Sequence, residues 1–172
     1  VYITISSGIG AGVILNGNLI EAWEGNFAEV GHMKVGEDLT CGCGREGHWE
    51  AYCSGNNLPD MAEELFELEY ENAREIFDAY NQGDEGAEKV IEKMNSINTD
   101  ALTDVTNIFN PEVIVFGGAV ALNHPENVIE PLKDEVEEKT VNSAPQIKKC
   151  DLGDEAVIHG LRAICNGKTD SF

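Results

Sequence analysis

Basic side chains are scarce in this sequence. Its 172 residues contain 11 lysines and arginines against 32 aspartates and glutamates, which gives a formal net charge of -21. Such a charge repels phosphate backbones and anionic lipid head groups, so the composition argues against nucleic acid and membrane surfaces as partners. The acid excess suggests a halophilic cytoplasm, where carboxylates keep a protein surface hydrated, and an ordinary acidic protein is the alternative.

Long apolar runs are also missing. No stretch approaches the roughly 20 residues that span a bilayer, and the N-terminus lacks the basic segment of a signal peptide. The sequence therefore predicts a cytoplasmic protein. Five cysteines are an odd number, and a reducing compartment keeps thiols free, so we expect no disulfide framework. Because the chain opens at Val1 in a strand pattern without an initiator methionine, we expect a fragment.

The first twenty residues predict an antiparallel hairpin. Residues 1–5 alternate between apolar and polar or amphipathic side chains, and Asn-Gly-Asn at residues 16–18 is a strong turn signal. Three glycines interrupt the apolar pattern between these segments, namely Gly8, Gly10 and Gly12. They either relieve crowding where another backbone passes close by, or provide amides that approach a phosphate.

The rest of the chain predicts an α/β domain in which helices alternate with short strands. Helical periodicity indicates two helices between residues 54 and 84 and one long core helix over residues 85–108. The wholly apolar segment 113–116 predicts a strand in a sheet that is covered on both faces. A helix over residues 126–139, a strand over 147–150 and a last helix complete the predicted order.

Residues 31–50 read GHMKVGEDLTCGCGREGHWE and have neither helical nor strand periodicity. The segment supplies two thiols and two imidazoles, which are His32, Cys41, Cys43 and His48. This donor set suits tetrahedral zinc, and the glycines between the donors allow tight backbone turns around an ion. The spacing does not match C-x2-C zinc fingers, so reduced thiols and histidines in a glycine-rich loop are the alternative.

The longer run EVGHMKVGEDLTCGCGREGHWEAYCSG resembles the signature of the ROK family, named for repressor, open reading frame and kinase. That signature is Glu-x-Gly-His, followed by Cys-x-Cys-Gly-x-x-Gly-Cys-x-Glu and a Ser-Gly. NPEVIVFGGAVA resembles the family's nucleotide-side Gly-Gly turn, and LGDEAVIHGLRAI resembles its C-terminal helix. The resemblance implies that residues 1–172 are the C-terminal lobe of a sugar kinase, a mixed sheet flanked by helices in the ribonuclease H-like and actin-like ATPase fold.

The resemblance also implies roles for residues on the sugar side. His32 stands at the histidine that binds zinc and reaches the sugar, and Cys41 and Cys43 match the next two zinc ligands. His48 replaces the family's usual fourth cysteine, which exchanges a thiolate for a neutral imidazole. The two glutamates that accept hydrogen bonds from sugar hydroxyls are matched by Glu29 and Glu50.

The implied chemistry is phosphoryl transfer from ATP to a hexose with Mg²⁺, and glucose is the hexose we expect. Five glycines fall where the family binds the nucleotide, namely Gly8, Gly10, Gly12, Gly117 and Gly118. The family's catalytic base is an aspartate of an Asn-Asp motif that would precede Val1, so we expect the chain alone to be inactive.

Two other functions are compatible with the same motifs. ROK proteins include sugar-responsive repressors with an upstream helix-turn-helix, and a third alternative is a sugar-binding module without catalysis. The acid excess argues weakly against the repressor, because DNA repels it. Family members are often dimers or tetramers through this lobe, so the resemblance also implies a homo-oligomer.

Overall fold

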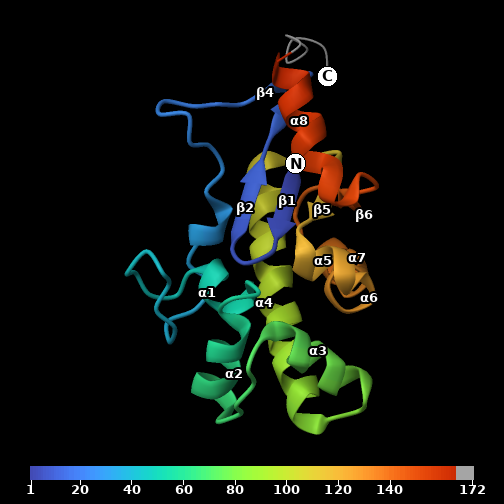
Figure 1. Ribbon diagram of the computed structural model, residues 1–172. Helices are drawn as coiled ribbons and strands as arrows, with labels where there is room; N and C mark the ends of the chain where they lie inside the picture. Colours follow the sequence, from blue (N-terminus) through green and yellow to red (C-terminus); the bar gives the residue numbers. More distant parts are fainter. Residues whose placement is uncertain (166–172) are drawn as a thin grey trace.

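The computed structural model describes residues 1–165, apart from the side chain of Asp154. Its main sheet has the strand order β2-β1-β5-β6 (Figure 1). In chain order these strands are β1 (Tyr2–Ile5), β2 (Ile9–Gly12), β5 (Val113–Gly117) and β6 (Gln146–Lys149). β1 pairs antiparallel with β2 and parallel with β5, and β5 pairs parallel with β6. The prediction of a mixed sheet is confirmed.

Two hairpins open the chain rather than one. β1 returns as β2 through a tight turn in which the Ser6 N–H donates to the Gly8 carbonyl at 2.9 Å. The second hairpin pairs β3 (Ile14–Leu15) with β4 (Asn18–Leu19) around the predicted Asn-Gly turn. Sequence analysis missed the first turn, because Ser-Ser-Gly is a weaker turn signal than Asn-Gly.

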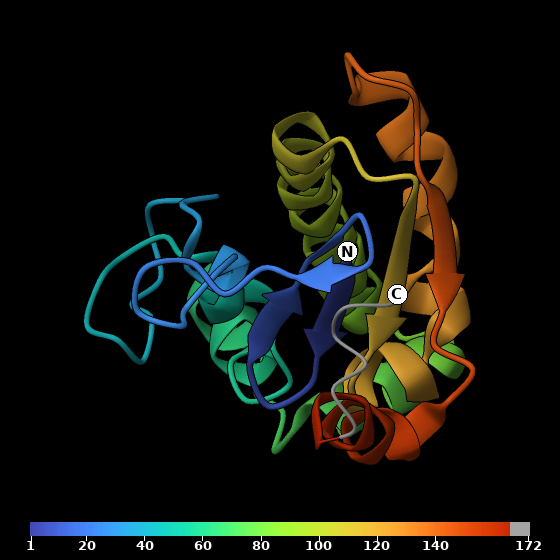
Figure 2. The same ribbon diagram turned by 90° about the horizontal axis from the view of Figure 1, so that it is seen from above.

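One face of the sheet carries the core. Side chains alternate along a strand, and the register pairs Ile3 with Phe116 and Ile114 with Ile147, so these four share one face. All four are buried, and Figure 2 shows α4 and α7 on one side of the sheet. Alternate residues of β5, among them Val115, are only partly buried. The predicted cover of strand 113–116 is therefore complete on one face only.

Most predicted helices are confirmed. The two helices expected between residues 54 and 84 are α2 (Leu58–Phe66) and α3 (Ala73–Asn81), and the long core helix is α4 (Glu85–Phe109). The single helix predicted over 126–139 is divided into α6 (Pro125–Val128) and α7 (Glu130–Lys139). The division falls beside Pro131, which has no N–H to continue the helical hydrogen bonding.

The remaining elements are two 3₁₀ turns and three helices. They are the 3₁₀ turns η1 (Val30–His32) and η2 (Gly153–Glu155), and the helices α1 (Trp49–Cys53), α5 (Ala119–Asn123) and α8 (Ala156–Cys165). Within residues 1–165, no helix is both long and apolar enough to cross a membrane. All five cysteines are free.

Candidate functional site

The segment from Glu29 to His48 is an irregular loop that is fixed at both ends by backbone hydrogen bonds. The Trp49 N–H donates to the Met33 carbonyl at 2.9 Å, and the Val35 N–H donates to the Gly47 carbonyl at 2.8 Å. Gly47 has a φ of 79°, and a Cβ at this position would collide with the Gly36 carbonyl. The loop can therefore close on itself only with glycine at residue 47.

The loop gathers the predicted ligand set in one place. One ligand atom from each of His32, Cys41, Cys43 and His48 lies within 4.8 Å of the others. The Cys41 Sγ lies 3.8 Å from the His32 Nδ1, and the Cys43 Sγ lies 3.3 Å from the His48 Nδ1. A tetrahedral zinc with ordinary bond lengths has sulfur-to-nitrogen edges of about 3.5 Å, and these two distances lie on either side of that value, so the four side chains could hold such an ion.

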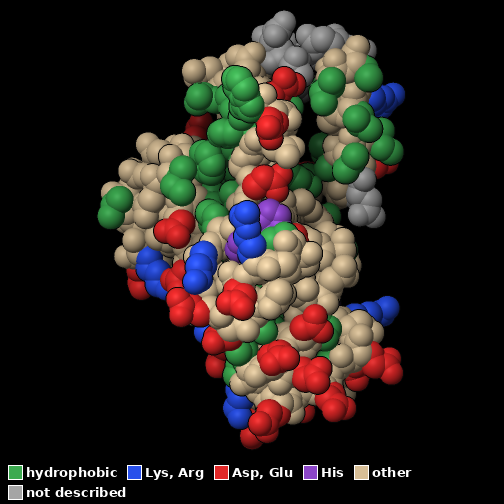
Figure 3. Space-filling model, turned by 90° about the vertical axis from the view of Figure 1, so that its left-hand side faces the viewer, with side chains coloured by type: hydrophobic (Ala, Val, Ile, Leu, Met, Phe, Trp, Pro, Cys, Tyr) green, Lys and Arg blue, Asp and Glu red, His purple; other side chains and the backbone are tan. Residues whose placement is uncertain are grey.

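The surroundings of His48 favour its metal-binding form. His48 is 7% exposed, and burial, reinforced by the neighbouring His32 and Arg45, lowers its pKa. A histidine must be neutral to bind a metal, so the lowered pKa of His48 suits the role. Figure 3 shows histidine side chains near the centre of this face of the molecule, with most acidic side chains toward its lower end.

Glu50 connects the cluster to the first hairpin. Its Oε2 accepts a hydrogen bond from the Ile9 N–H at 2.8 Å, and its Oε1 lies 3.8 Å from the Cys41 Sγ. A Cβ on Gly8 would lie 2.6 Å from the Glu50 Oε2, so the hairpin turn rests directly against this carboxylate. Helix α1 thus brings one predicted sugar ligand to both the metal cluster and the glycine turn.

The two ring nitrogens of His32 face two different neighbours. Its Nδ1 faces Cys41 in the metal cluster, and its Nε2 lies 3.9 Å from the Glu29 Oε2. Glu29 and His32 have side-chain exposures of 64% and 39%, so both are open to a ligand from solvent. One imidazole can therefore bind a metal through one nitrogen while the other nitrogen hydrogen-bonds a hydroxyl beside Glu29.

A second candidate region lies at the carboxyl ends of the parallel strands β1 and β5. Gly118 follows β5 with φ 85° and ψ 154°, and a Cβ there would meet the Ile5 carbonyl and the Thr4 Oγ1. Gly117 pairs with Thr4 at the end of β1. Ligands of open α/β sheets bind at such strand ends, so the geometry suits a nucleotide.

The structure separates the three N-terminal glycines. Gly8 lies in the hairpin turn, at the end of β1 where Glu50 and the Gly117–Gly118 turn also lie. Gly10 and Gly12 lie within β2, and Gly12 pairs with Tyr2 at the opposite end of the strands. Of these three predicted nucleotide residues, only Gly8 belongs to the turn itself.

Sequence analysis missed α1 and the residue that secures the loop to it. The Tyr52 hydroxyl accepts hydrogen bonds from the N–H groups of Asp38 and Leu39 at 3.0 and 3.3 Å, which ties the loop of residues 29–48 to the helix. Trp49, Tyr52 and Cys53 are all buried, and their i, i+3, i+4 spacing is the signal that identifies the helix.

Comparison with solved structures identifies the fold. The ROK hexokinase from Thermus thermophilus superposes with a TM-score of 0.86 at 34% identity, covering 97% of this chain and 57% of that one. A ROK glucokinase from Streptomyces griseus, in complex with glucose and AMPPNP, gives 0.79 at 26% identity, with 95% and 59% covered. The chain therefore has the actin-like ATPase fold of ROK kinases, and the predicted fold class is confirmed.

Sequence comparison agrees. Residues 1–168 match the ROK family, and the chain belongs to that family. A glucokinase from Aeropyrum pernix is 30% identical over 186 aligned positions, which cover 95% of this chain and 57% of the relative. An N-acetylmannosamine kinase from Yersinia pestis is 34% identical over 122 positions, with 70% and 41% covered. The chain thus spans little more than half the length of the glucokinase.

The fold alone does not separate kinases from regulators. A ROK family transcriptional regulator, a homologue of the E. coli MLC protein, superposes with a TM-score of 0.79 at 24% identity, covering 98% of this chain and 46% of that one. The choice between the two functions therefore depends on the site and on experiment.

Proposed function

We propose that this chain is the sugar-binding lobe of a ROK kinase, and that the complete protein transfers a phosphoryl group from ATP to a hexose, most simply glucose. The observation that carries the proposal is the convergence of Glu29, His32 and Glu50 beside one cluster of metal ligands. Two carboxylates and an imidazole provide acceptors and a donor for neighbouring hydroxyls of one pyranose ring. The glucokinase and hexokinase relatives support this assignment.

Each side of the site has its own task in this proposal. Glu29 and Glu50 accept hydrogen bonds from sugar hydroxyls, and the His32 Nε2 completes the set. His32, Cys41, Cys43 and His48 hold a structural zinc ion, which would keep the loop closed and these groups oriented. Gly8 and the Gly117–Gly118 turn bring backbone amides toward the phosphates of ATP and its Mg²⁺.

The proton of the attacking hydroxyl needs a base, and this proposal gives both glutamates of the described site to sugar binding. Glu50 accepts the Ile9 N–H and contacts Cys41, while Glu29 lies beside His32. We therefore expect no sugar phosphorylation by the 172-residue chain alone, and robust ATP-dependent turnover by this chain would contradict that expectation.

The test is ADP release by the complete polypeptide in low and molar salt, with glucose, fructose, mannose and N-acetylmannosamine offered separately. Release with one sugar establishes the kinase and names its substrate, and a requirement for molar salt agrees with the halophilic composition. Sugar binding without ADP release from any of the four would overturn the kinase assignment and favour the regulator or a non-catalytic binding module.

A further inference from the structure

Helix α1 is short, yet it positions two residues of the proposed site. It spans only Trp49–Cys53, yet His48 is its N-cap and Glu50 lies in its first turn. A helix this short is not stable by itself, so its position depends on tertiary contacts. The contacts that hold α1 therefore also set the position of a metal ligand and a sugar ligand.

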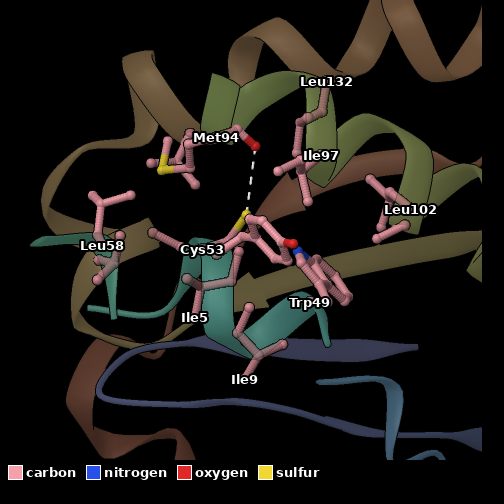
Figure 4. Packing of buried hydrophobic residues seen from close by; sticks show 14 of the residues in the cluster. Ile5, Ile9, Trp49, Cys53, Leu58, Met94, Ile97, Leu102 and Leu132 are labelled. Atoms are coloured by element: carbon pink, nitrogen blue, oxygen red, sulfur yellow. Dashed lines mark hydrogen bonds between the residues drawn. The ribbon is translucent and has the colours of Figure 1, made fainter. Parts of the chain in front are cut away.

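Two hydrogen bonds join α1 to the long helix α4. The Trp49 Nε1–H donates to the Asn98 Oδ1 at 2.7 Å, and the Cys53 Sγ lies 3.6 Å from the Met94 carbonyl. In Figure 4, Trp49 and Cys53 point from α1 toward α4. Trp49 and Cys53 are one helical turn apart, as are Met94 and Asn98, so the two contacts fix both the rotation of α1 and its register along α4.

Asn98 is an unusual residue for this place. It is 0% exposed in the middle of α4, and its Nδ2 has no hydrogen-bond partner. Asparagine is a poor helix former, and a buried unpaired amide nitrogen is costly. The bond to Trp49 is the interaction that compensates for these costs, and it is stronger and more directional than the thiol contact of Cys53.

We propose that Asn98 is a positioning residue for the site: through Trp49 it sets the place of His48 in the metal cluster and of Glu50 against the sugar. Asn98 itself is not one of the residues that would contact the metal or the sugar. The inference rests on the proposed function for its sugar-binding part, whereas its metal-binding part depends only on the cluster.

The experiment compares complete polypeptides carrying Asn98→Leu, Asn98→Leu with Trp49→Phe, or Thr103→Val. Thr103 is a matched control, because its buried hydroxyl lies on the same helix and donates to the Thr99 carbonyl. Zinc affinity is measured by competition with a chromophoric chelator, and kcat and the KM for glucose are measured well below each melting temperature. Differences in global stability then do not enter these constants.

We expect Asn98→Leu to weaken zinc affinity by about tenfold, as the loss of a group that orients a metal ligand does. The KM for glucose should rise several-fold, with a smaller change in kcat. The double variant should regain stability, because no polar group is left unpaired, yet keep the weak zinc affinity and the high KM. Thr103→Val should lower stability alone.

Unchanged zinc affinity in Asn98→Leu, with a melting temperature lowered as in Thr103→Val, would overturn the inference. So would a double variant that regains zinc affinity together with stability. A complete protein without turnover would instead contradict the proposed function, and the chelator competition would still decide the role of Asn98.

Discussion

The proposed sugar side and the proposed nucleotide side of the candidate site rely on different parts of the chain. On the proposed sugar side, between Glu29 and Glu50, the chemistry lies in side chains that a loop and a short helix bring together. On the proposed nucleotide side it lies in the backbone, where a Cβ on Gly8 would meet the Glu50 carboxylate and a Cβ on Gly118 would meet the end of β1. The sugar side should therefore be sensitive to the removal of functional groups, and the nucleotide side to the addition of a single carbon.

The largest effect should come from breaking the metal cluster. Cys41→Ser removes a buried ligand, and because binding at a structural zinc site adds about 10–16 kcal/mol to folding, we expect loss of stoichiometric zinc, a clearly lower melting temperature and loss of sugar binding. Metal analysis, calorimetry and sugar titration measure the three. Cys165→Ser is the control, because that exposed thiol in α8 lies outside the cluster, and equal behaviour of the two variants would argue against a metal.

Glu50→Gln should have the next largest effect. The glutamine oxygen can still accept the Ile9 N–H, so the hairpin turn is kept, but the charged acceptor for the sugar is lost. A hydrogen bond to a charged group contributes about 1.5–3 kcal/mol, which corresponds to a loss of sugar affinity of about 10- to 150-fold. Isothermal titration with glucose measures it. Glu46→Gln changes an exposed glutamate of the same loop and should leave sugar affinity unchanged.

Gly118→Ala tests the nucleotide side. The φ of 85° and ψ of 154° at this residue lie in a region that costs a non-glycine residue about 1–3 kcal/mol, and the new Cβ also meets the end of β1. We expect a several-fold higher KM for ATP with a nearly unchanged KM for glucose. Gly12→Ala places its Cβ in open space and should change neither constant. A raised KM for ATP in Gly12→Ala would return that residue to the nucleotide site.

His48→Cys should have the smallest effect. It restores the ligand that the ROK signature carries at this position, and a thiolate is as good a zinc ligand as an imidazole. We expect stoichiometric zinc and sugar affinity within about twofold of the original. Loss of zinc from this variant, measured by metal analysis, would show that the Cys-x-Cys loop is shaped for histidine.

The same contrast explains what could be predicted from the sequence. The Cys/His cluster is predictable from its donor set, whereas Glu29 and Glu50 are singled out only by the resemblance to the ROK signature. Helical periodicity predicts α4 to within one residue at its C-terminus. Gly8 and Gly12 look alike in the sequence, and only the strand register separates them. The tie between Trp49 and Asn98 joins residues far apart in the chain, which no local pattern records.

Glucose binding before and after zinc removal tests most directly the claim that the metal cluster organises the sugar site. The complete polypeptide is titrated with glucose as prepared, after exhaustive chelation, and after zinc is restored. The account predicts that sugar affinity and melting temperature fall together on chelation and return together with zinc. Complete removal of the metal, with glucose affinity and melting temperature both unchanged, would contradict it.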